Sequence, residues 1–316
     1  MKPIRAVLAL LLAMPLVALG QVGEQAKQPA EAKKAISIYD EKADAKAQVA
    51  AAVATAKREN KRVLIQWGGN WCSWCILLHD RFKSDAALAK TLLYEYVVVH
   101  IDSNNNAELA AKYGADFKKH GVPYLTVLDA DGKVLTNDST VPFETKIDDK
   151  NGHDARKLQE FLTTHVAAAL KADEVLAAGF AEAAKSERMV FLHFGAPWCG
   201  WCRKLDAWLV RSDVEKVFCK DFVDVQIDID RMQGGKEVML RYRKSDKGGI
   251  PWFVMLDAKG KALATSDAPE GNIGFPYTEA EIAYFVTMLN TCKRRLTDRD
   301  VAVLRESLIP PPKAGK

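Results

Sequence analysis

The apolar and polar positions of this chain fall into two series with the same order of elements. The first series begins with an Ala-rich segment, 44–60, whose apolar residues recur at helical spacing, and continues with a short apolar run, 63–67. The second series begins with a similar amphipathic segment, 173–185, followed by an apolar run, 189–194. The pattern therefore predicts a helix followed by a buried strand at the start of each half.

The two halves also share three blocks of sequence in the same order. The blocks are 61–75 and 187–202, then 95–102 and 221–230, then 120–135 and 248–263. A cysteine and a proline within these blocks are 51 residues apart in the first half and 52 in the second (Cys72 to Pro123, Cys199 to Pro251). Matched blocks at matched spacing indicate a duplicated domain.

The rest of each half completes the expected fold. A second strand and helix follow the cysteines, then a hairpin turned by Asp-Ala-Asp-Gly-Lys or Asp-Ala-Lys-Gly-Lys, whose Asp and Gly favour a turn. Closing helices are expected over 154–170 and 278–295. Strands that alternate with helices and end in a hairpin indicate an α/β fold, in which each domain has a central mixed sheet flanked by helices.

The N-terminus has the pattern of a secretory signal. Lys2 and Arg5 precede an apolar run, 6–20, that ends in small residues, so cleavage is expected before Gln21. The run is shorter than the ~20 residues that cross a bilayer. We therefore expect a periplasmic or secreted protein with no membrane span in the mature chain.

These patterns predict the division of the whole chain. The predicted parts are a signal peptide (1–20), a linker (21–42), a first domain (43–171), a second domain (172–298) and a C-terminal extension (299–316). The composition, 48% hydrophobic and 27% charged, is ordinary for a globular protein with two cores. A net charge of +4 gives no reason to expect a nucleic-acid partner.

Four of the six cysteines form two Cys-x-x-Cys motifs, each where an apolar strand is expected to give way to a helix. A thiol at a helix N-terminus is stabilised as the thiolate, which is the form that attacks a disulfide. Cys72 and Cys199 are therefore the candidate catalytic nucleophiles. Cys75 and Cys202, one helical turn further on, are the candidate resolving thiols.

With Val122-Pro123 and Ile250-Pro251 before the hairpins, these motifs make each half similar to a thioredoxin domain. The Trp-Cys-Gly-Trp-Cys variant is most similar to exported bacterial thioredoxin-like proteins. The resemblance implies two thioredoxin-like domains, thiol-disulfide oxidoreductase activity, and cis bonds before both prolines. It also implies that the backbone of Val122 or Ile250 lies beside the sulfurs, where an extended substrate can pair as an added strand. Pro123 and Pro251 thus join the candidate substrate-binding residues.

Three tryptophans near these motifs, Trp71, Trp198 and Trp252, are expected to offer apolar contact to extended substrates. The resemblance implies protein thiols or disulfides as substrates. The chain has no nicotinamide or flavin fingerprint, so we expect no cofactor and another thiol-redox protein as electron partner. The residues between the cysteines match neither thioredoxin nor protein disulfide isomerase, so the direction of the redox reaction stays open.

Thioredoxin has a buried Asp six residues before its first cysteine, and here Gln66 and His193 take that position. An imidazole titrates near ~6.5 and can act as a base, whereas an amide cannot. We therefore expect His193 to assist catalysis in a more active second half. Asp224, Gln226 and Asp228 share one strand face by alternation, so one of them is expected to orient His193, with Asp224 as the first candidate. A core histidine bonded to a backbone carbonyl is the alternative.

Other interpretations of the motifs stay open. A zinc site would need Cys-x-x-Cys pairs closer together in sequence, so no metal is expected. The chain can also be a redox-inactive binding module, either a holdase or a metal-handling protein, or carry structural disulfides. Cys219, expected at the end of the helix that starts at Cys199, and Cys292 are interpreted as small buried thiols, with a third disulfide between them as the alternative.

Overall fold

The computed structural model describes residues 37–245 and 247–309. The predicted signal peptide, most of the predicted linker and the end of the C-terminal extension lie outside the described residues. Within the described part of the chain, no helix is long and apolar enough to cross a membrane. This part contains the two α/β domains that the repeat predicts.

The first domain is built on a four-stranded mixed sheet in the order β2-β1-β3-β4. Strand β1 is parallel to β2 and antiparallel to β3, and β3 forms the predicted hairpin with β4. The elements in chain order are α1 (Ala45–Glu59), β1 (Arg62–Gly68), α2 (Ser73–Ser84), α3 (Ala86–Glu95), β2 (Tyr96–Asp102), α4 (Ala107–Lys112), α5 (Phe117–His120), β3 (Tyr124–Leu128), β4 (Val134–Ser139), the 3-10 helix η1 (Val141–Phe143), β5 (Glu144–Ile147), β6 (Lys150–His153) and α6 (Ala155–Thr164).

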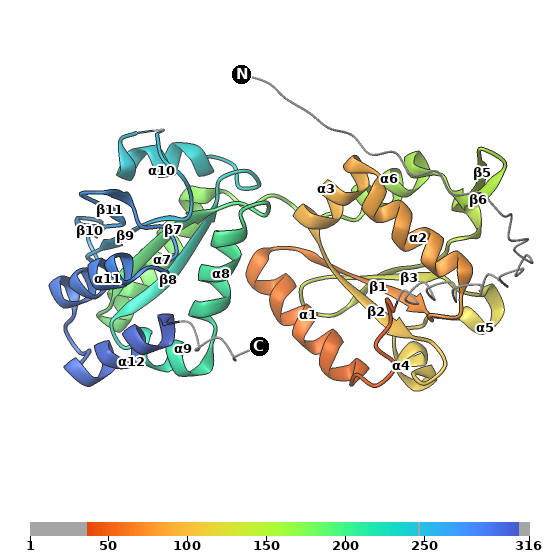
Figure 1. Ribbon diagram of the computed structural model, residues 1–316, viewed down its shortest axis with the longest axis horizontal. Helices are drawn as coiled ribbons and strands as arrows, with labels where there is room; N and C mark the ends of the chain where they lie inside the picture. The colour runs from red at the N-terminus through yellow and green to blue at the C-terminus, as the bar shows by residue number, and fades with distance from the viewer. Residues whose placement is uncertain (1–36, 246, 310–316) are drawn as a thin grey trace, which may run out of the picture. The chain divides into compact units, whose positions relative to one another are not determined.

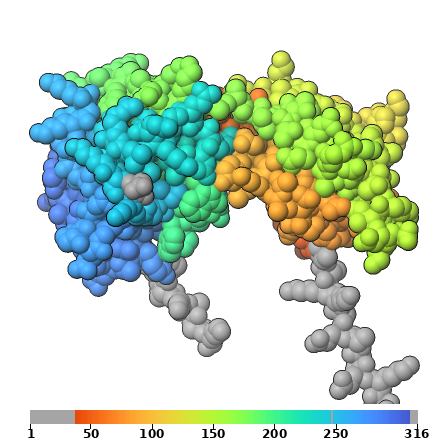
Figure 2. Space-filling view, turned by 90° about the horizontal axis from the view of Figure 1, so that it is seen from above, coloured from red at the N-terminus to blue at the C-terminus, as the bar shows by residue number. Residues whose placement is uncertain are grey.

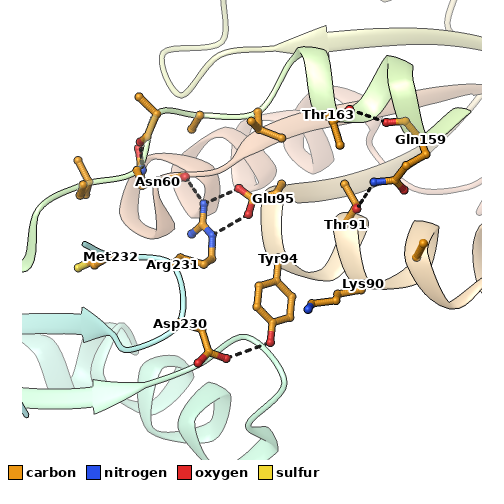
Figure 3. Close-up of a pocket in the computed structure, with 16 residues that line it drawn as sticks. Asn60, Lys90, Thr91, Tyr94, Glu95, Gln159, Thr163, Asp230, Arg231 and Met232 are labelled. Carbon is orange, nitrogen blue, oxygen red and sulfur yellow. Dashed lines mark hydrogen bonds and ion pairs between the residues drawn. The ribbon is translucent and has the colours of Figure 1, made fainter. Parts of the chain in front are cut away.

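Strand β1 sends alternate side chains into two apolar cores. Ile65 and Trp67 pack with α1 on one face of the sheet, whereas Leu64 packs with α2, α3 and α6 on the other. Figure 1 shows these helices on opposite sides of the sheet. On the second face, Gln159 of α6 donates a hydrogen bond from Nε2 to Oγ1 of Thr91 in α3 at 2.8 Å (Figure 3). Because β1 is covered on both faces, a polar side chain in it needs a partner inside the protein.

The second domain repeats this plan in the order β8-β7-β9-β10. Its elements are α7 (Ala172–Ser186), β7 (Met189–Gly195), α8 (Gly200–Leu209), α9 (Ser212–Phe218), β8 (Phe222–Asp228), α10 (Gly235–Arg243), β9 (Trp252–Leu256), β10 (Ala262–Thr265), β11 (Asp267–Ala268), β12 (Gly271–Asn272), α11 (Glu279–Cys292) and α12 (Asp298–Leu308). Figure 2 shows one face of the surface, with residues of the first domain in orange to yellow-green and those of the second in green to blue.

Strand β7 has the same alternation as β1. Leu192 and Phe194 pack with α7 and α10, whereas Phe191 packs with α8, α9, α11 and α12. His193 shares the face of Phe191, and their ring centroids are 5.6 Å apart. In both domains, the residue six positions before the first cysteine therefore lies on the strand face that meets the cysteine helix.

The predicted elements are present, and their ends differ in places. The closing helix expected over 154–170 ends at Thr164, with His165 as its C-cap, and α7 begins at Ala172. The predicted hairpin turn is found, with Asp129 accepting hydrogen bonds from the backbone N–H groups of Asp131 and Lys133 at 2.9 Å. The local turn residues were therefore a reliable guide to this hairpin.

Two expectations about the remaining cysteines are wrong. The helix from Cys199 does not continue to Cys219, because α8 ends at Leu209 and a separate helix, α9, follows. Cys219 is exposed instead of buried, because it caps the end of the short helix α9. Cys292 is buried as expected, and both residues are free thiols.

Segments outside the predicted domains also pack on them. Tyr39, near the end of the predicted linker, is buried in the first domain. Helix α12 starts at the last residue of the predicted second domain and continues into the predicted C-terminal extension, and its residues Val301 and Leu304 are buried in the core of the second domain. Both segments therefore contribute to the folded protein.

Candidate active site

In each domain the first cysteine of the motif caps the helix that follows the central strand. Cys72 is the N-cap of α2 and Cys199 the N-cap of α8, both with extended backbone. The backbone N–H of Cys75 donates to Sγ of Cys72 at 3.1 Å, and that of Cys202 donates to Sγ of Cys199 at 3.0 Å. An N–H group at a helix N-terminus stabilises negative charge on the sulfur. Both first cysteines are therefore placed to be thiolates when reduced.

Each pair forms a disulfide, with its Cα atoms 5.2 Å apart. In this state all four cysteines are nearly covered. Cys72 is 6% exposed and Cys75 0%, while Cys199 is 4% exposed and Cys202 3%. The first cysteine is thus the more exposed member of each pair, by a narrow margin in the second domain.

A second loop meets each disulfide. The bonds Val122–Pro123 and Ile250–Pro251 are cis, as the resemblance implied. Sγ of Cys72 lies 3.7 Å from the carbonyl oxygen of Val122, and Sγ of Cys199 lies 3.5 Å from that of Ile250. The backbone before each proline therefore borders the sulfurs, as expected.

Two of the three tryptophans expected at the surface are found there. Trp71 is 61% exposed and Trp198 is 56% exposed. Trp252 is fully buried, so the expectation that it contacts substrates is wrong. It begins β9, which lies between β7 and β10 and is covered on both faces, and its indole N–H donates to Asp267 at 2.8 Å. The side chain is thus part of the core.

An aromatic surface beside the second disulfide was missed from the sequence. Trp201, between the two cysteines, is exposed and lies with its ring centroid 6.3 Å from that of Phe275 and 5.7 Å from that of Tyr277. Nζ of Lys204 lies 3.9 Å from the Trp201 ring centroid. With Ile250–Pro251, the three aromatic residues line a surface groove. The Phe-Pro-Tyr run had no pattern that linked it to the cysteines.

His193 is buried between two carboxylates of the second domain. Its Nε2 lies 2.9 Å from Oδ1 of Asp224, and its Nδ1 lies 3.8 Å from Oδ1 of Asp206. The distance between His193 and Asp224 is that of an ion pair, but the angle at Nε2 is not that of a hydrogen bond. Asp224 is the neighbour that strand alternation predicted.

The surroundings of His193 favour its protonated form. Burial by itself lowers the pKa of His193, but the carboxylates of Asp224 and Asp206 outweigh it and leave the pKa raised. Burial raises the pKa of Asp206, and the nearby His193 opposes this rise. Both groups therefore hold a proton more readily than they do in water.

Asp206 is the polar residue of this site that was missed from the sequence. It lies four residues after Cys202 on α8, so the two side chains share one face of the helix. Its Oδ2 accepts a hydrogen bond from Nε2 of Gln226 at 3.0 Å, while Oδ1 accepts none from the residues that the structure describes. The i, i+4 spacing from the second cysteine was a usable signal.

The first domain has different side chains at these positions. Gln66 is buried, and its Nε2 donates to Oη of Tyr39 at 2.8 Å and to the carbonyl oxygen of Cys75 at 3.2 Å. His79 and His100 take the places of Asp206 and Gln226, with ring centroids 5.2 Å apart. Burial lowers the pKa of both, to about 4 for His100. Both imidazoles are therefore neutral at pH 7.

Two segments of the chain, 44–130 and 171–258, match the family described as thioredoxin-like. Together they make up more than half of the 316 residues. Comparison with curated proteins gives no match. The matched segments contain both cysteine pairs and both cis prolines.

Solved structures of thiol-redox proteins are also similar to parts of the chain. A disulphide isomerase from Xylella fastidiosa is 29% identical over 41% of this chain and 96% of its own, with a TM-score of 0.34. The oxidoreductase DsbH is 23% identical over 38% of this chain and 82% of its own, with a TM-score of 0.28. A thioredoxin from Thermus thermophilus is 26% identical over 30% of this chain and 71% of its own, with a TM-score of 0.24.

Proposed function

Because this chain belongs to the thioredoxin-like family, we propose that it is a thiol-disulfide oxidoreductase that exchanges disulfides with protein substrates through Cys72–Cys75 and Cys199–Cys202. One observation carries the proposal. In each domain the first sulfur sits at a helix N-terminus, accepts a backbone hydrogen bond, and forms a disulfide with the second. A binding module that makes no use of thiol chemistry has no need of this arrangement twice.

The roles of the cysteines follow from their order on the helix. In the reducing direction, the thiolate of Cys72 or Cys199 attacks one sulfur of a substrate disulfide, and the other substrate sulfur leaves with the electron pair. Cys75 or Cys202 then loses its proton and attacks the first cysteine, which releases the second substrate sulfur as a thiolate that takes up a proton. The substrate gains two electrons and two protons, and the protein pair loses them. The oxidising direction is the reverse.

The substrate surface proposed for each domain consists of the exposed tryptophan and the cis-proline loop. In the first domain it is Trp71 with Val122–Pro123, and in the second it is Trp198 with Ile250–Pro251. The backbone of each loop offers an edge for an extended chain, while the indole gives apolar contact. The groove beside Trp201 extends this surface in the second domain.

His193 is proposed as the group that takes the proton from Cys202. The resolving thiol must lose a proton before it attacks, and a base beside it raises the rate of that step. The contacts of His193 with Asp206 and Asp224 support the role, because the two carboxylates stabilise the imidazolium that forms when His193 takes the proton. Gln66 cannot take a proton, so the second domain is proposed to be the faster one.

The setting of this activity is also a proposal. We infer that residues 1–20 direct export to the periplasm or outside the cell, and that 43–171 and 172–298 fold as the two domains. The electron partner is another thiol protein, because the exchange needs only sulfur chemistry. No cofactor takes part in the exchange as written.

The reduction of insulin by dithiothreitol, with and without the protein, tests the activity. The full chain should accelerate reduction, and the double variant Cys72→Ser/Cys199→Ser should not. Each single variant should keep the contribution of the other domain. A wild-type protein that does not accelerate the reaction, or a double variant as fast as the wild type, contradicts the proposed function.

A further inference from the structure

The segment that precedes α1 is fastened to the turn beside the first disulfide. Asn70, two residues before Cys72, accepts hydrogen bonds at Oδ1 from the backbone N–H groups of Ile38 and Tyr39, at 2.8 and 3.0 Å. Its Nδ2 donates to the carbonyl oxygen of Tyr39 at 2.9 Å. These three bonds hold the backbone at Tyr39 in one position relative to the cysteine helix.

The side chain of Tyr39 lies close to Sγ of Cys75. It is buried and packs in one apolar cluster with Cys72 and Cys75. A Cβ atom at Gly68 would overlap both Oη of Tyr39 and Sγ of Cys75, at less than 3.0 Å from each. Oη of Tyr39 and Sγ of Cys75 therefore border the same small space and lie less than 6 Å apart. The space is free because Gly68 has no side chain.

The hydrogen-bond roles around Tyr39 can be assigned from its neighbours. The carbonyl oxygen of Cys75 can only accept, so the amide of Gln66 must direct Nε2 toward it, at 3.2 Å. The same Nε2 lies 2.8 Å from Oη of Tyr39 and donates to it. The hydroxyl hydrogen of Tyr39 thus points elsewhere, and among the described residues it has no hydrogen-bond acceptor in this oxidised state, while Sγ of Cys75 borders the same space.

The phenol is protonated at neutral pH. Burial raises the pKa of Tyr39, the carboxylate of Asp102 at the end of β2 raises it further, and the hydrogen bond from Gln66 only partly opposes them. The other titratable neighbour is His100, whose ring centroid lies 5.6 Å from that of Tyr39 and whose pKa is lowered by burial to about 4. With His100 neutral, Tyr39 is a donor next to Cys75.

The described residues of the second domain have no counterpart of this arrangement. Pro197 takes the position of Asn70 and has no side-chain amide to hold a segment. A Cβ atom at Gly195, which matches Gly68, would meet only Cys202 within 4 Å among the described residues. Behind the second disulfide, the place that matches the one filled by Tyr39 therefore holds no polar group.

We propose that Tyr39 is a positioning residue for thiol exchange at the first pair, and that its hydroxyl donates a hydrogen bond to the Cys75 sulfur when the pair is reduced. The inference rests on the proposed function. The bond stabilises the Cys75 thiolate, which attacks Sγ of Cys72, forms the Cys72–Cys75 bond and releases the substrate sulfur with its electron pair. The proton that leaves Cys75 ends on the released sulfur. The hydroxyl keeps its own proton throughout.

The test uses the full chain with the second pair silenced as Cys199→Ser/Cys202→Ser. In glutathione buffers at pH 7, Tyr39→Phe should shift the thiol-disulfide equilibrium of Cys72–Cys75 about tenfold toward the disulfide, because the reduced form loses a hydrogen bond to sulfur. Release of a mixed disulfide at Cys72 should slow by about the same factor. Trapping with an alkylating reagent and mass spectrometry measures both.

Tyr96→Phe is the matched control. Tyr96 is also buried in the first domain, and its hydroxyl donates to the carbonyl oxygen of Leu162 at 2.6 Å, at the other end of the sheet. It should leave the equilibrium and the release rate unchanged. Equal shifts in both variants, or no shift in Tyr39→Phe, overturn the inference.

Asn70→Ala gives a second route that keeps the phenol. It removes the three hydrogen bonds to Ile38 and Tyr39 and a fourth, from Nδ2 to Oε1 of Glu41 at 3.1 Å, and so frees the segment. It should shift the same equilibrium in the same direction as Tyr39→Phe. An unchanged equilibrium in Asn70→Ala overturns the inference. A wild-type first pair that does not exchange with glutathione contradicts the proposed function, and the role of Tyr39 with it.

Discussion

The side chains behind the two disulfides come from three matching positions: one in the central strand, one in the cysteine helix and one in the neighbouring strand. These positions hold Gln66, His79 and His100 in the first domain, and His193, Asp206 and Gln226 in the second. In the second domain the helix and central-strand positions carry groups with raised pKa values, whereas the imidazoles of the first domain have lowered ones. The duplicated fold thus keeps the geometry of the sulfurs and changes the groups that hold protons.

The largest effect is expected from the central strand of the second domain. In a chain whose first pair is silenced by Cys72→Ser/Cys75→Ser, His193→Gln should slow disulfide exchange about 10²-fold, the lower end of what a general base contributes. The rate should also lose most of its pH dependence between pH 6 and 8. Stopped-flow exchange with a model disulfide measures this.

His165→Gln is the control for His193→Gln. His165 also lies in a folded part of the chain, and its Nδ1 is 2.8 Å from the carbonyl oxygen of Phe161, away from both disulfides. Its replacement should leave the exchange rate unchanged. A His193→Gln variant as fast as its parent would show that His193 only packs in the core.

Acid should affect the stability of the two domains in opposite directions. Burial, aided by Arg81, lowers the pKa of His153 in the first domain to about 4, below that of an unfolded histidine near ~6.5. Since the unfolded state binds the proton first, the stability is present above pH 6.5 and is lost as pH falls toward 4. The loss between pH 7 and pH 5 should be about 2 kcal/mol from this histidine. The raised pKa values of His193 and Asp206 act in the opposite direction: because the folded second domain binds protons more readily than the unfolded chain, these two groups raise its stability as pH falls.

His153→Phe should remove the share of the acid loss that comes from His153, while His100 and His79 keep theirs. Both ring nitrogens of His153 lack hydrogen-bond partners among the described residues, and its ring contacts Trp74 edge-on at 5.3 Å, so a phenyl ring fits the site. Urea unfolding at pH 5 and 7, followed by proteolysis with fragments assigned to the first domain, measures the change. A variant whose unfolding free energy still falls by the wild-type amount between pH 7 and 5 contradicts this account.

A smaller effect is expected when one carboxylate beside His193 is neutralised. Asp224→Asn removes a negative charge 2.9 Å from Nε2, so the pKa of His193 should fall. The acid limb of the pH profile of the exchange rate should then move to lower pH. The exchange rate at pH 7 should change by up to about tenfold. A pH profile that does not move, or that moves to higher pH, would separate Asp224 from the function of His193.

The smallest effect is expected from the cysteines outside the motifs. Cys219→Ser should change the unfolding free energy by less than about 0.5 kcal/mol, because the residue is exposed. Cys292 is buried, and burial raises the pKa of its thiol to about 11, so it should be alkylated far more slowly than Cys219. Peptide mapping without reduction should find both as free thiols. A Cys219–Cys292 disulfide would remove this difference.

Much of the fold could be predicted from the sequence because its signals are local. The cysteine motif, the residue before each proline and the hairpin turns are short patterns that recur at the same spacing in both halves. Asp224 was among the three candidates because strand alternation fixes which residues share a face. The exposure of side chains was harder to predict. Trp252 was expected at the surface, but it starts a central strand and is buried. Cys219 was expected at the buried end of one long helix, but it caps the second of two short helices and is exposed.

Asp206 and Tyr39 are the two polar residues that were missed from the sequence, and each was missed for a different reason. Asp206 lies one helical turn beyond Cys202, so its position could have been read from the sequence, but an isolated acidic residue on a helix is usually solvated. Tyr39 lies 27 residues before Gln66 in a stretch that has no periodic pattern. Its contact depends on the side chain of Asn70, and only the folded structure brings these residues together.

The match to the thioredoxin-like family begins at residue 44, whereas Tyr39 and Asn70 are joined across that boundary. A protein shortened to begin at residue 44 would retain Asp44, the N-cap of α1, together with the whole sheet and both cysteines. It would lose the phenol that borders Cys75. On the role proposed for Tyr39, truncation at the family boundary should alter the redox couple of the first pair, and a fragment that keeps the native couple must include Ile38 and Tyr39.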